Sequence, residues 1–583
     1  MKFLRNFLAS LLALFVFTVG GFFLFVIIAS LMEGSEKVTL RSNSVLKIEL
    51  NQMLADRDFD DPLANLSFAG NNLKRIGVIN LRNALEHAKE DDKIKGVVLS
   101  APTLIGGFGY GEELRNALED FKTSGKFIYS YADILTEGGY YISSVADSLY
   151  ISPQGSVEWN GLSVEMSFFK GTFEKLEIEP QIFRVGDYKS AVEPFILDKM
   201  SKDNRAQLTS SVESIYKQMV SEVAKDIHMP AKELRKLSDD LAIRTAEDAV
   251  NKGLITGLIY KDEFEQLLAS KIGEEDPDDI NYIDYQDYNK SYSSSRASKN
   301  KIAVVIADGE IINAKPEQGI ITAAQFVKQL KKVRENDRIK AVVFRINSPG
   351  GDALVSDLIW RAVDETRKIK PVIASFANYG ASGGYYIGMA ADSIVAEPNT
   401  ITGSIGVFAM IFNIGDFMSH KLGITTDYVT TGDYSGMWTS SRALTSEEKQ
   451  IIQNGINHTY EVFTSKAAEG RHMNVESLRE LASGRVWTGS QAVENGLVDV
   501  LGGLDDAIDI AAAKAGVEDN YQVRYYPTSK TSVEKLIEEL SGKTQDKIAR
   551  EKLGDMYPYL DLIKKLKSLR GLQARMPFEF DVR

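Results

Sequence analysis

The sequence repeats itself at a separation of about 245 residues, and this duplication limits what the chain can fold into. The pentapeptide Gly-Gly-Tyr-Tyr-Ile stands at 138–142 and again at 383–387. Further matches follow at nearly the same separation on both sides of it. A repeat of this length indicates two copies of one fold. We place them at about residues 76–273 and 320–516.

Within each copy, apolar segments of strand length alternate with helical patterns. In the first copy we expect a strand at 96–99, a helix at 112–122 and a strand at 127–131. The second copy is preceded by an apolar segment at 301–308 that is also typical of a strand. This alternation is typical of βαβ units around a parallel sheet, so we predict an α/β fold.

The N-terminus predicts a membrane anchor. Lys2 and Arg5 precede an apolar run without charges at 6–32. That run reaches the length of about 20 residues that crosses a bilayer, and it exceeds the apolar part of a signal peptide. We expect a transmembrane helix in a bacterial inner membrane, with the bulk of the chain on the periplasmic side. A cleaved signal peptide is the alternative, although Ala29-Ser30-Leu31 is a poor cleavage site.

Composition and periodicity divide the chain into five segments. We expect the anchor at 1–37, the first repeat at 38–290, a Ser-rich linker at 291–300 and the second repeat at 301–525. The remaining segment, 526–583, has a charged helical pattern to which we assign no role.

Composition also excludes several classes of function. The net charge of −13 argues against a nucleic-acid partner, and the chain contains no cysteine. The sequence has neither a His/Asp/Glu cluster at ligand spacing nor a phosphate-binding GxxxxGK[ST] loop. We therefore expect no metal and no cofactor.

A glycine-rich turn at 380–386 in the second copy holds a candidate nucleophile. Ser382 lies there between small residues and is followed by two glycines, which suits a sharp turn with an exposed hydroxyl. A second turn, Asn-Ser-Pro-Gly-Gly at 347–351, follows an apolar strand pattern. Amides at Gly351 and Gly383 could stabilise an oxyanion. Taken alone, an Ala-Ser-Gly-Gly turn is more often only a turn.

The two copies differ at the positions that such chemistry would use. The first copy has Glu137 in place of Ser382 and Trp159 in place of Ser404. Only the second copy can therefore supply the serine nucleophile.

The reverse holds for a candidate base. After a shared Gly-Asp-Tyr, the first copy has Lys189 where the second has Ser435. Complementary losses indicate one composite site at the interface between the copies. A lysine acts as a base when burial keeps it neutral, and Ser404 could orient its amine. The alternative is that the two copies diverged at random after the duplication, and that Lys189 is a solvated surface lysine.

Histidine is the more common base for a serine. None of the five histidines accompanies a glycine turn or a strand end, so we interpret them as surface or structural residues, without excluding a Ser-His-Asp triad. They are His87, His228, His420, His458 and His472.

At this point the motifs resemble those of the S49 serine peptidases, in their long, tandem-domain signal peptide peptidase form. The resemblance is carried by the turns at 347–351 and 381–385, by Thr-Gly-Ser-Ile-Gly at 402–406 and by Gly186–Phe195. It covers nearly the whole chain from the membrane segment to about residue 520.

The resemblance implies a ClpP/crotonase-like fold in both repeats and a Ser/Lys dyad shared between them. Ser382 matches the nucleophile, Lys189 the general base and Ser404 the serine that assists the lysine. Gly351 and Gly383 match the oxyanion region, with the choice between the two adjacent glycines of the first turn left open. The resemblance also implies remnant signal peptides as substrates and a homotetramer.

The predicted function is that of a membrane-anchored serine endopeptidase that cuts short hydrophobic peptides, such as released signal peptides, through an acyl-enzyme. A crotonase-like enzyme acting on acyl thioesters and a non-catalytic scaffold are the alternatives. A thioester enzyme would not need Lys189 as a base. In a non-catalytic scaffold, Ser382 would not react with an acylating probe.

Overall fold

A computed structural model describes most of the chain, including both repeats. The described residues are 2–33, 38–58, 75–292, 298–316, 319–527 and 572–576. The helical pattern predicted for the C-terminal tail lies outside the described residues.

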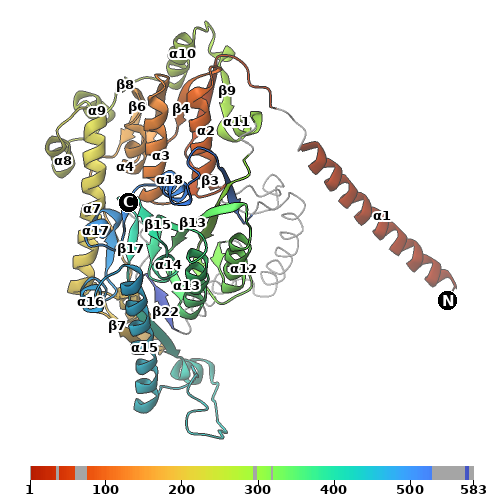
Figure 1. Ribbon diagram of the computed structural model, residues 1–583, viewed down its shortest axis with the longest axis vertical. Helices are drawn as coiled ribbons and strands as arrows, with labels where there is room; N and C mark the ends of the chain where they lie inside the picture. The colour runs from red at the N-terminus through yellow and green to blue at the C-terminus, as the bar shows by residue number, and fades with distance from the viewer. Residues whose placement is uncertain are drawn as a thin grey trace.

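Each half of the chain is built around its own sheet (Figure 1). Six strands follow matching orders in the two sheets. The first runs in the order β8 (Gly257–Leu258), β6 (Ser148–Val157), β5 (Phe127–Leu135), β4 (Ile94–Ser100), β1 (Ser44–Glu49) and β9 (Asn281–Asp284). The second sheet has eight strands, and one path through it runs in the order β20 (Val500–Leu501), β16 (Ser393–Ala396), β15 (Val372–Ala381), β13 (Ile339–Ser348), β10 (Lys301–Asp308) and β21 (Gln522–Tyr526). Strand β15 also pairs with β17 (Ile401–Gly403), which in turn pairs with β19 (Val486–Thr488). All neighbours on these two paths are parallel, as the alternating pattern predicted.

Helices pack against these sheets in matching places in the two halves. They include α2 (Val78–Glu90), α3 (Phe108–Lys122) and α4 (Glu137–Ser143) in the first half, and α12 (Ala323–Arg334), α13 (Ala353–Arg367), α14 (Gly383–Gly388) and α18 (Leu504–Ala515) in the second. The helix predicted at 112–122 begins earlier, at Phe108, because Asn378 of the other half accepts a hydrogen bond from the Tyr110 N–H at 2.9 Å. The start of α3 is therefore fixed by a contact between the halves.

The remaining elements of the described chain connect or flank these layers. They are α1 (Lys2–Glu33), β2 (Met53–Ala55), β3 (Arg75–Gly77), α5 (Lys170–Leu176), α6 (Glu193–Ile196), α7 (Lys202–Asp226), α8 (Ala231–Asp239), α9 (Ala246–Asn251), α10 (Lys261–Ile272), α11 (Tyr285–Ser291), β17 (Ile401–Gly403), α15 (Ser446–Gly470), α16 (Val475–Leu481), β19 (Val486–Thr488), α17 (Gly489–Glu494) and the short turns Ser190–Val192, Pro277–Asp279 and Phe417–Lys421.

A third sheet combines strands from both halves. Its order is β12 (Ile320–Ile321), β11 (Glu310–Ile311), β14 (Gly350–Asp352), β22 (Gln573–Arg575), β18 (Val407–Asn413) and β7 (Glu179–Val185). Strand β7 of the first half pairs with β18 of the second in antiparallel register along its whole length, from Glu179 opposite Asn413 to Val185 opposite Val407. This pairing brings the chain that follows β7 into the second half.

A buried ion cluster also joins the halves. Arg345 of β13 has no exposed surface, and its guanidinium lies 2.8 Å from Asp56 and 2.7 Å from Glu113, both in the first half. Burial alone would lower the pKa of Arg345, but the two carboxylates outweigh it and raise the pKa. The arginine is therefore charged, and it neutralises two carboxylates that are almost fully buried.

The N-terminal helix α1 stands apart from the sheets in Figure 1. Among the residues that the structure describes, no helix is both long enough and apolar enough to span a bilayer, so the predicted transmembrane anchor stays a prediction.

We predict that Arg345→Ala lowers the free energy of unfolding by about 3–5 kcal/mol, because it leaves two carboxylates buried without a counter-charge. Urea denaturation measures the change. Arg361→Ala is the matched control: its side chain is 58% exposed and pairs with Asp364 and Glu365 at the surface. We expect a loss of about 1 kcal/mol or less from the control. Equal effects of the two substitutions would contradict the role of the buried cluster.

Candidate functional site

Ser382 lies between the end of β15 and the first turn of α14. Its backbone has a positive φ of 54°, which is uncommon for a residue with a side chain. Its N–H donates to the carbonyl of Gly403 at 2.8 Å, and its own carbonyl accepts from the Tyr386 N–H at 2.8 Å. The tertiary contacts therefore hold the serine in a strained turn of the kind found at functional sites. The predicted sharp turn into a helix is present.

The prediction that the hydroxyl is exposed is wrong. Ser382 has no exposed surface, and neither does Lys189 or Ser404. Lys189 from the first half contacts the hydroxyl, and Ala574 of β22 lies beside the neighbouring Gly383. A sequence pattern identifies the turn, but it does not reveal which distant segment covers it.

Lys189 reaches the serine from the first half of the chain. It follows β7 by four residues, and its Nζ lies 2.8 Å from the Oγ of Ser382. The same Nζ lies 3.0 Å from the Oγ and 3.0 Å from the carbonyl oxygen of Ser404. The three side chains that the sequence analysis singled out thus meet in one place.

The environment of Lys189 favours the neutral amine. Burial lowers the pKa of Lys189 well below its usual 10.5, because the ammonium form would lose its hydration. In the part of the chain that the structure describes, no carboxylate forms an ion pair with Lys189, so nothing offsets that cost. A neutral amine keeps a lone pair that can accept the proton of the Ser382 hydroxyl.

Two glycines leave room for the lysine side chain. A Cβ on Gly484 would lie 2.7 Å from the Lys189 Cβ, and one on Gly406 would lie 3.1 Å from its Cδ. The backbone before the lysine is also fixed, because the Tyr188 carbonyl accepts from Gln207 Nε2 of α7 at 3.0 Å.

The sequence analysis missed Gly484 and Gln207. The repeat held a signal for Gly484: at the separation of 243 residues seen in this part of the chain, the matching position in the first copy is Leu241.

The predicted oxyanion region lies beside Ser382. Gly383 is the first residue of α14, and a Cβ on it would lie 3.1 Å from the Cα of Gly350. The N–H of Gly350 donates to Ser348 Oγ at 3.2 Å, so it is already engaged. The neighbouring Gly351 lies opposite Ala574 of β22 and adopts a φ of 152° that favours glycine.

The first copy fills the corresponding positions with buried, hydrogen-bonded groups other than a hydroxyl. The Glu137 carboxylate accepts from the N–H groups of Asn160 at 3.1 Å and Gly161 at 2.9 Å. Trp159, in place of Ser404, is fully buried and donates from its indole nitrogen to the Leu234 carbonyl at 3.0 Å. Burial raises the pKa of Glu137 to about 7, against the opposing effect of these N–H groups.

None of the hydrogen bonds in the described chain joins a histidine to Ser382. His87 stacks on Tyr292 with ring centroids 3.6 Å apart, and His420 Nδ1 lies 2.6 Å from a carboxylate oxygen of Glu177. His228 and His472 lie just beyond helix ends, and His458 lies within α15. The serine therefore has a lysine as its nearest titratable neighbour.

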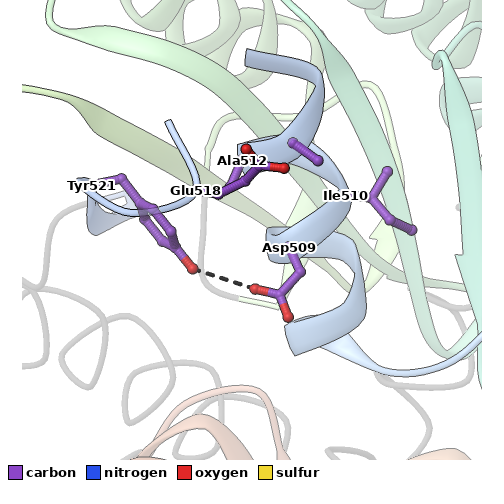
Figure 2. Close-up of a pocket in the computed structure, with 6 residues that line it drawn as sticks. Asp509, Ile510, Ala512, Glu518 and Tyr521 are labelled. Carbon is purple, nitrogen blue, oxygen red and sulfur yellow. Dashed lines mark hydrogen bonds between the residues drawn. The ribbon is translucent and has the colours of Figure 1, made fainter. Parts of the chain in front are cut away.

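Two cavities, one along α18 and one lined by residues such as Lys122 and Lys271, do not include the predicted site residues. Figure 2 shows one of about 380 Å³ along α18, where Tyr521 donates to Asp509 at 3.4 Å. It is lined by none of the predicted site residues. Over the described residues, no group of three or more His, Asp or Glu side chains is arranged to hold a metal ion.

The family model and the related proteins that match this chain point to the same family. The model of peptidase family S49 matches residues 120–273 and 364–518, one match in each repeat. The chain is 35% identical over 498 residues to the serine protease SPPA of Arabidopsis thaliana chloroplasts, covering 84% of this chain and 72% of that protein. It is also 34% identical over 511 residues to Protease 4 of Haemophilus influenzae, and this match covers 84% of the present chain and 82% of that protein.

Among solved structures, the chain is similar to a ClpP1 mutant from Listeria monocytogenes. The identity is 17%, the TM-score is 0.24, and the match covers 35% of this chain and 94% of the other. The mixed α/β architecture and the tandem repeat of the sequence analysis are confirmed.

We predict that Glu137 makes the folded state less stable as the pH rises. Its pKa is raised from 4.5 to about 7, so the folded state retains a proton that the unfolded state releases. The contribution of Glu137 to the free energy of unfolding is complete below pH 4.5 and is lost between that pH and about 7. The whole contribution is about 3 kcal/mol at most. Urea denaturation of the wild type and of Glu137→Gln across this range measures it. If the two free energies of unfolding run parallel with pH, the prediction is wrong.

Proposed function

The chain belongs to peptidase family S49 and is a serine peptidase, and from this premise we propose that it uses a Ser/Lys dyad formed by Ser382 and Lys189. The observation that carries the proposal is the 2.8 Å contact between Nζ and Oγ in a site without exposed surface. A charged lysine would be costly there, whereas a neutral amine is a base of the right strength.

In the proposed reaction, Nζ of Lys189 takes the proton of Ser382 as Oγ attacks the carbonyl carbon of the peptide. Ser404 Oγ and its carbonyl hold the amine in place, which aims the lone pair at the serine. The tetrahedral oxyanion is stabilised by the amides of Gly351 and Gly383, a contribution of about 3–4 kcal/mol per donor in comparable sites.

Collapse of this intermediate breaks the peptide bond. The ammonium of Lys189 then returns the proton to the leaving amine, and the acyl group stays on Ser382. In the second half-reaction, Lys189 takes a proton from water, and the hydroxide oxygen attacks the ester carbonyl. As the second tetrahedral intermediate collapses, the Lys189 ammonium returns this proton to Ser382 Oγ. Release of the carboxylic acid then leaves no net change in the enzyme.

We propose further that the substrates are short hydrophobic peptides such as released signal peptides, and that the enzyme is anchored in a bacterial inner membrane. The support is the uncharged apolar run at 6–32 behind Lys2 and Arg5, together with exposed side chains such as Phe3 and Phe17 on α1. A homotetramer follows from the family resemblance alone, whereas the periplasmic placement of the catalytic part follows from the two basic residues before the apolar run.

A small activated ester that acylates Ser382 tests the dyad. We expect the mass of the wild-type protein to increase by one acyl group, and Ser382→Ala to show no such increase. Lys189→Ala should slow acylation by about 10²–10⁴-fold, because the serine loses its base.

The pH dependence separates a base from a structural lysine. The acylation rate should rise with pH as Lys189 loses its proton and level off well below 10.5, because burial lowers the pKa of Lys189. Rapid acylation of Lys189→Ala would exclude the dyad, and an unreactive Ser382 in the wild type would favour a non-catalytic scaffold.

The anchor is tested by fractionation of cells that express the full chain. We expect the protein to stay in the membrane pellet after carbonate extraction, and a variant lacking residues 6–32 to be released. Release of the full chain by carbonate would refute the anchor. Protease added to spheroplasts should digest the catalytic part if it is periplasmic. Protection from the protease would indicate the opposite orientation in the membrane.

A further inference from the structure

The oxyanion turn, residues 347–351, begins with a side chain to which the proposed reaction gives no part. Asn347 donates from Nδ2 to Oδ1 of Asp308 at 2.8 Å, and its Oδ1 accepts from the N–H of Tyr379 at 3.2 Å. Its backbone carbonyl accepts from the N–H of Gly309 at 2.9 Å. Asp308 and Tyr379 belong to β10 and β15, the two strands that flank β13 in the second sheet. One residue near the end of β13 therefore bridges both of its neighbours.

Strand β15 has a bulge at the point where Asn347 contacts it. From Ile346 to Ser348, β13 pairs with the stretch 376–380 of β15, so the three residues between these pairs lie opposite Asn347 alone. Bulged residues are left out of the regular ladder, and the strand bends there. Tyr379 is one of these residues, and the side chain of Asn347 gives its N–H an acceptor on β13.

Both ends of this bridge lead directly to the candidate site. Tyr379 lies three residues before Ser382, at the end of the strand that carries the nucleophile. On the other side, Asp308 leads into β11, where Ile311 pairs with Gly351 of the oxyanion turn. The side chain of Asn347 thus connects the strand of the nucleophile to the backbone that supports the turn facing it.

This placement matters for the proposed reaction, in which Ser382 Oγ and the amide donors must meet around one carbonyl group. A displacement of about 1 Å can cost about 100-fold in rate, even when the altered residue lies away from the chemistry. Among the hydrogen bonds of the described residues, none joins Asn347 to Ser382, Lys189 or Ser404. We therefore expect Asn347 to act through the strand and the turn that it connects.

The two copies differ at this position as well. At the separation of 245 residues, the first copy has Pro102, whose ring has no side-chain donor or acceptor. The same copy has Glu137 in place of the nucleophile Ser382. The bridging amide thus occurs in the copy that carries the nucleophile and is missing from the copy that lacks it.

We propose that Asn347 is a positioning residue of the peptidase, which holds the oxyanion turn against the strand of Ser382 by bridging Asp308 and Tyr379. The proposal rests on the peptidase function proposed above. It predicts that Asn347 governs the rate of acyl transfer to Ser382 and leaves the binding of the acyl donor nearly unchanged.

The test exchanges the two groups of the bridge, and its readout is the maximal rate at which saturating activated ester acylates Ser382. Asn347→Asp removes the donor and sets a second carboxylate against Asp308, so we expect this rate to fall about 100-fold. The ester concentration that gives half of the maximal rate should change by less than about threefold, because the interaction acts in the transition state. Asp308→Asn keeps an oxygen that can accept from Asn347, and it should cost about threefold or less.

The double variant, Asn347→Asp with Asp308→Asn, restores one carboxylate and one amide in exchanged positions. The carboxylate at position 347 can still accept from the Tyr379 N–H, and it can now also accept from the amide at position 308. We expect the maximal rate to return to within about fivefold of the wild type. A double variant as slow as Asn347→Asp alone would contradict the bridge.

Asn413→Asp is the matched control, because Asn413 makes the same kind of bridge at the end of β18 away from Ser404. Its Nδ2 donates to Oε2 of Glu179 at 3.0 Å, and its Oδ1 accepts from the N–H of Gly415 at 3.1 Å. This variant should acylate at the wild-type rate. Thermal unfolding and the final acylated fraction report the state of the fold. If Asn347 serves only stability, Asn347→Asp reaches a smaller acylated fraction at the wild-type rate, or the control slows equally, and the proposal is overturned.

A second measurement does not depend on catalysis. Asn347→Ala removes both side-chain bonds, so hydrogen–deuterium exchange of the backbone at 378–382, read by mass spectrometry, should become about tenfold faster. Asn413→Ala should leave exchange in this stretch unchanged. Unchanged exchange in Asn347→Ala would overturn the proposal. Faster exchange in a protein whose wild type is never acylated would instead reject the proposed peptidase function and leave the bridge between strand and turn standing.

Discussion

The structure depends on one costly arrangement, the burial of a lysine without a counter-charge. An ammonium group that has lost its hydration and has no carboxylate beside it is strongly disfavoured, so Lys189 is held as the amine. The surrounding fold supplies what this requires: two serine hydroxyls and a carbonyl as hydrogen-bond partners, and two glycines that let the side chain pass. The same burial that destabilises the charge creates a base able to deprotonate an alcohol.

The duplication explains how one chain can build such a site. Each copy retains one half of it. Ser435, the second copy's equivalent of Lys189, is an exposed residue. Glu137 and Trp159 occupy the first copy's positions as buried, hydrogen-bonded groups. The cost is a dependence on the interface: the antiparallel pairing of β7 with β18 and the buried cluster around Arg345 must both form before Lys189 and Ser382 can meet.

The third sheet unites the site, its oxyanion turn and the C-terminal strand. Because β14 and β18 are separated by one strand position, a strand is needed between them to pair their backbone groups. In the described chain that position is held by residues 572–576.

The sequence by itself determined the duplication, the parallel α/β architecture, the turn that carries Ser382 and the lysine that the second copy lacks. These features are recorded in local patterns: the period of apolar residues, the small residues of a turn, and the comparison of one copy with the other. Only the tertiary structure decided that Ser382 is buried, that Gly350 is already engaged through Ser348, and that residues 572–576 lie over the oxyanion turn. The physical reason is range: Lys189 and Ser382 are 193 residues apart. Their contact depends on strand pairing between the two halves, which no local pattern encodes.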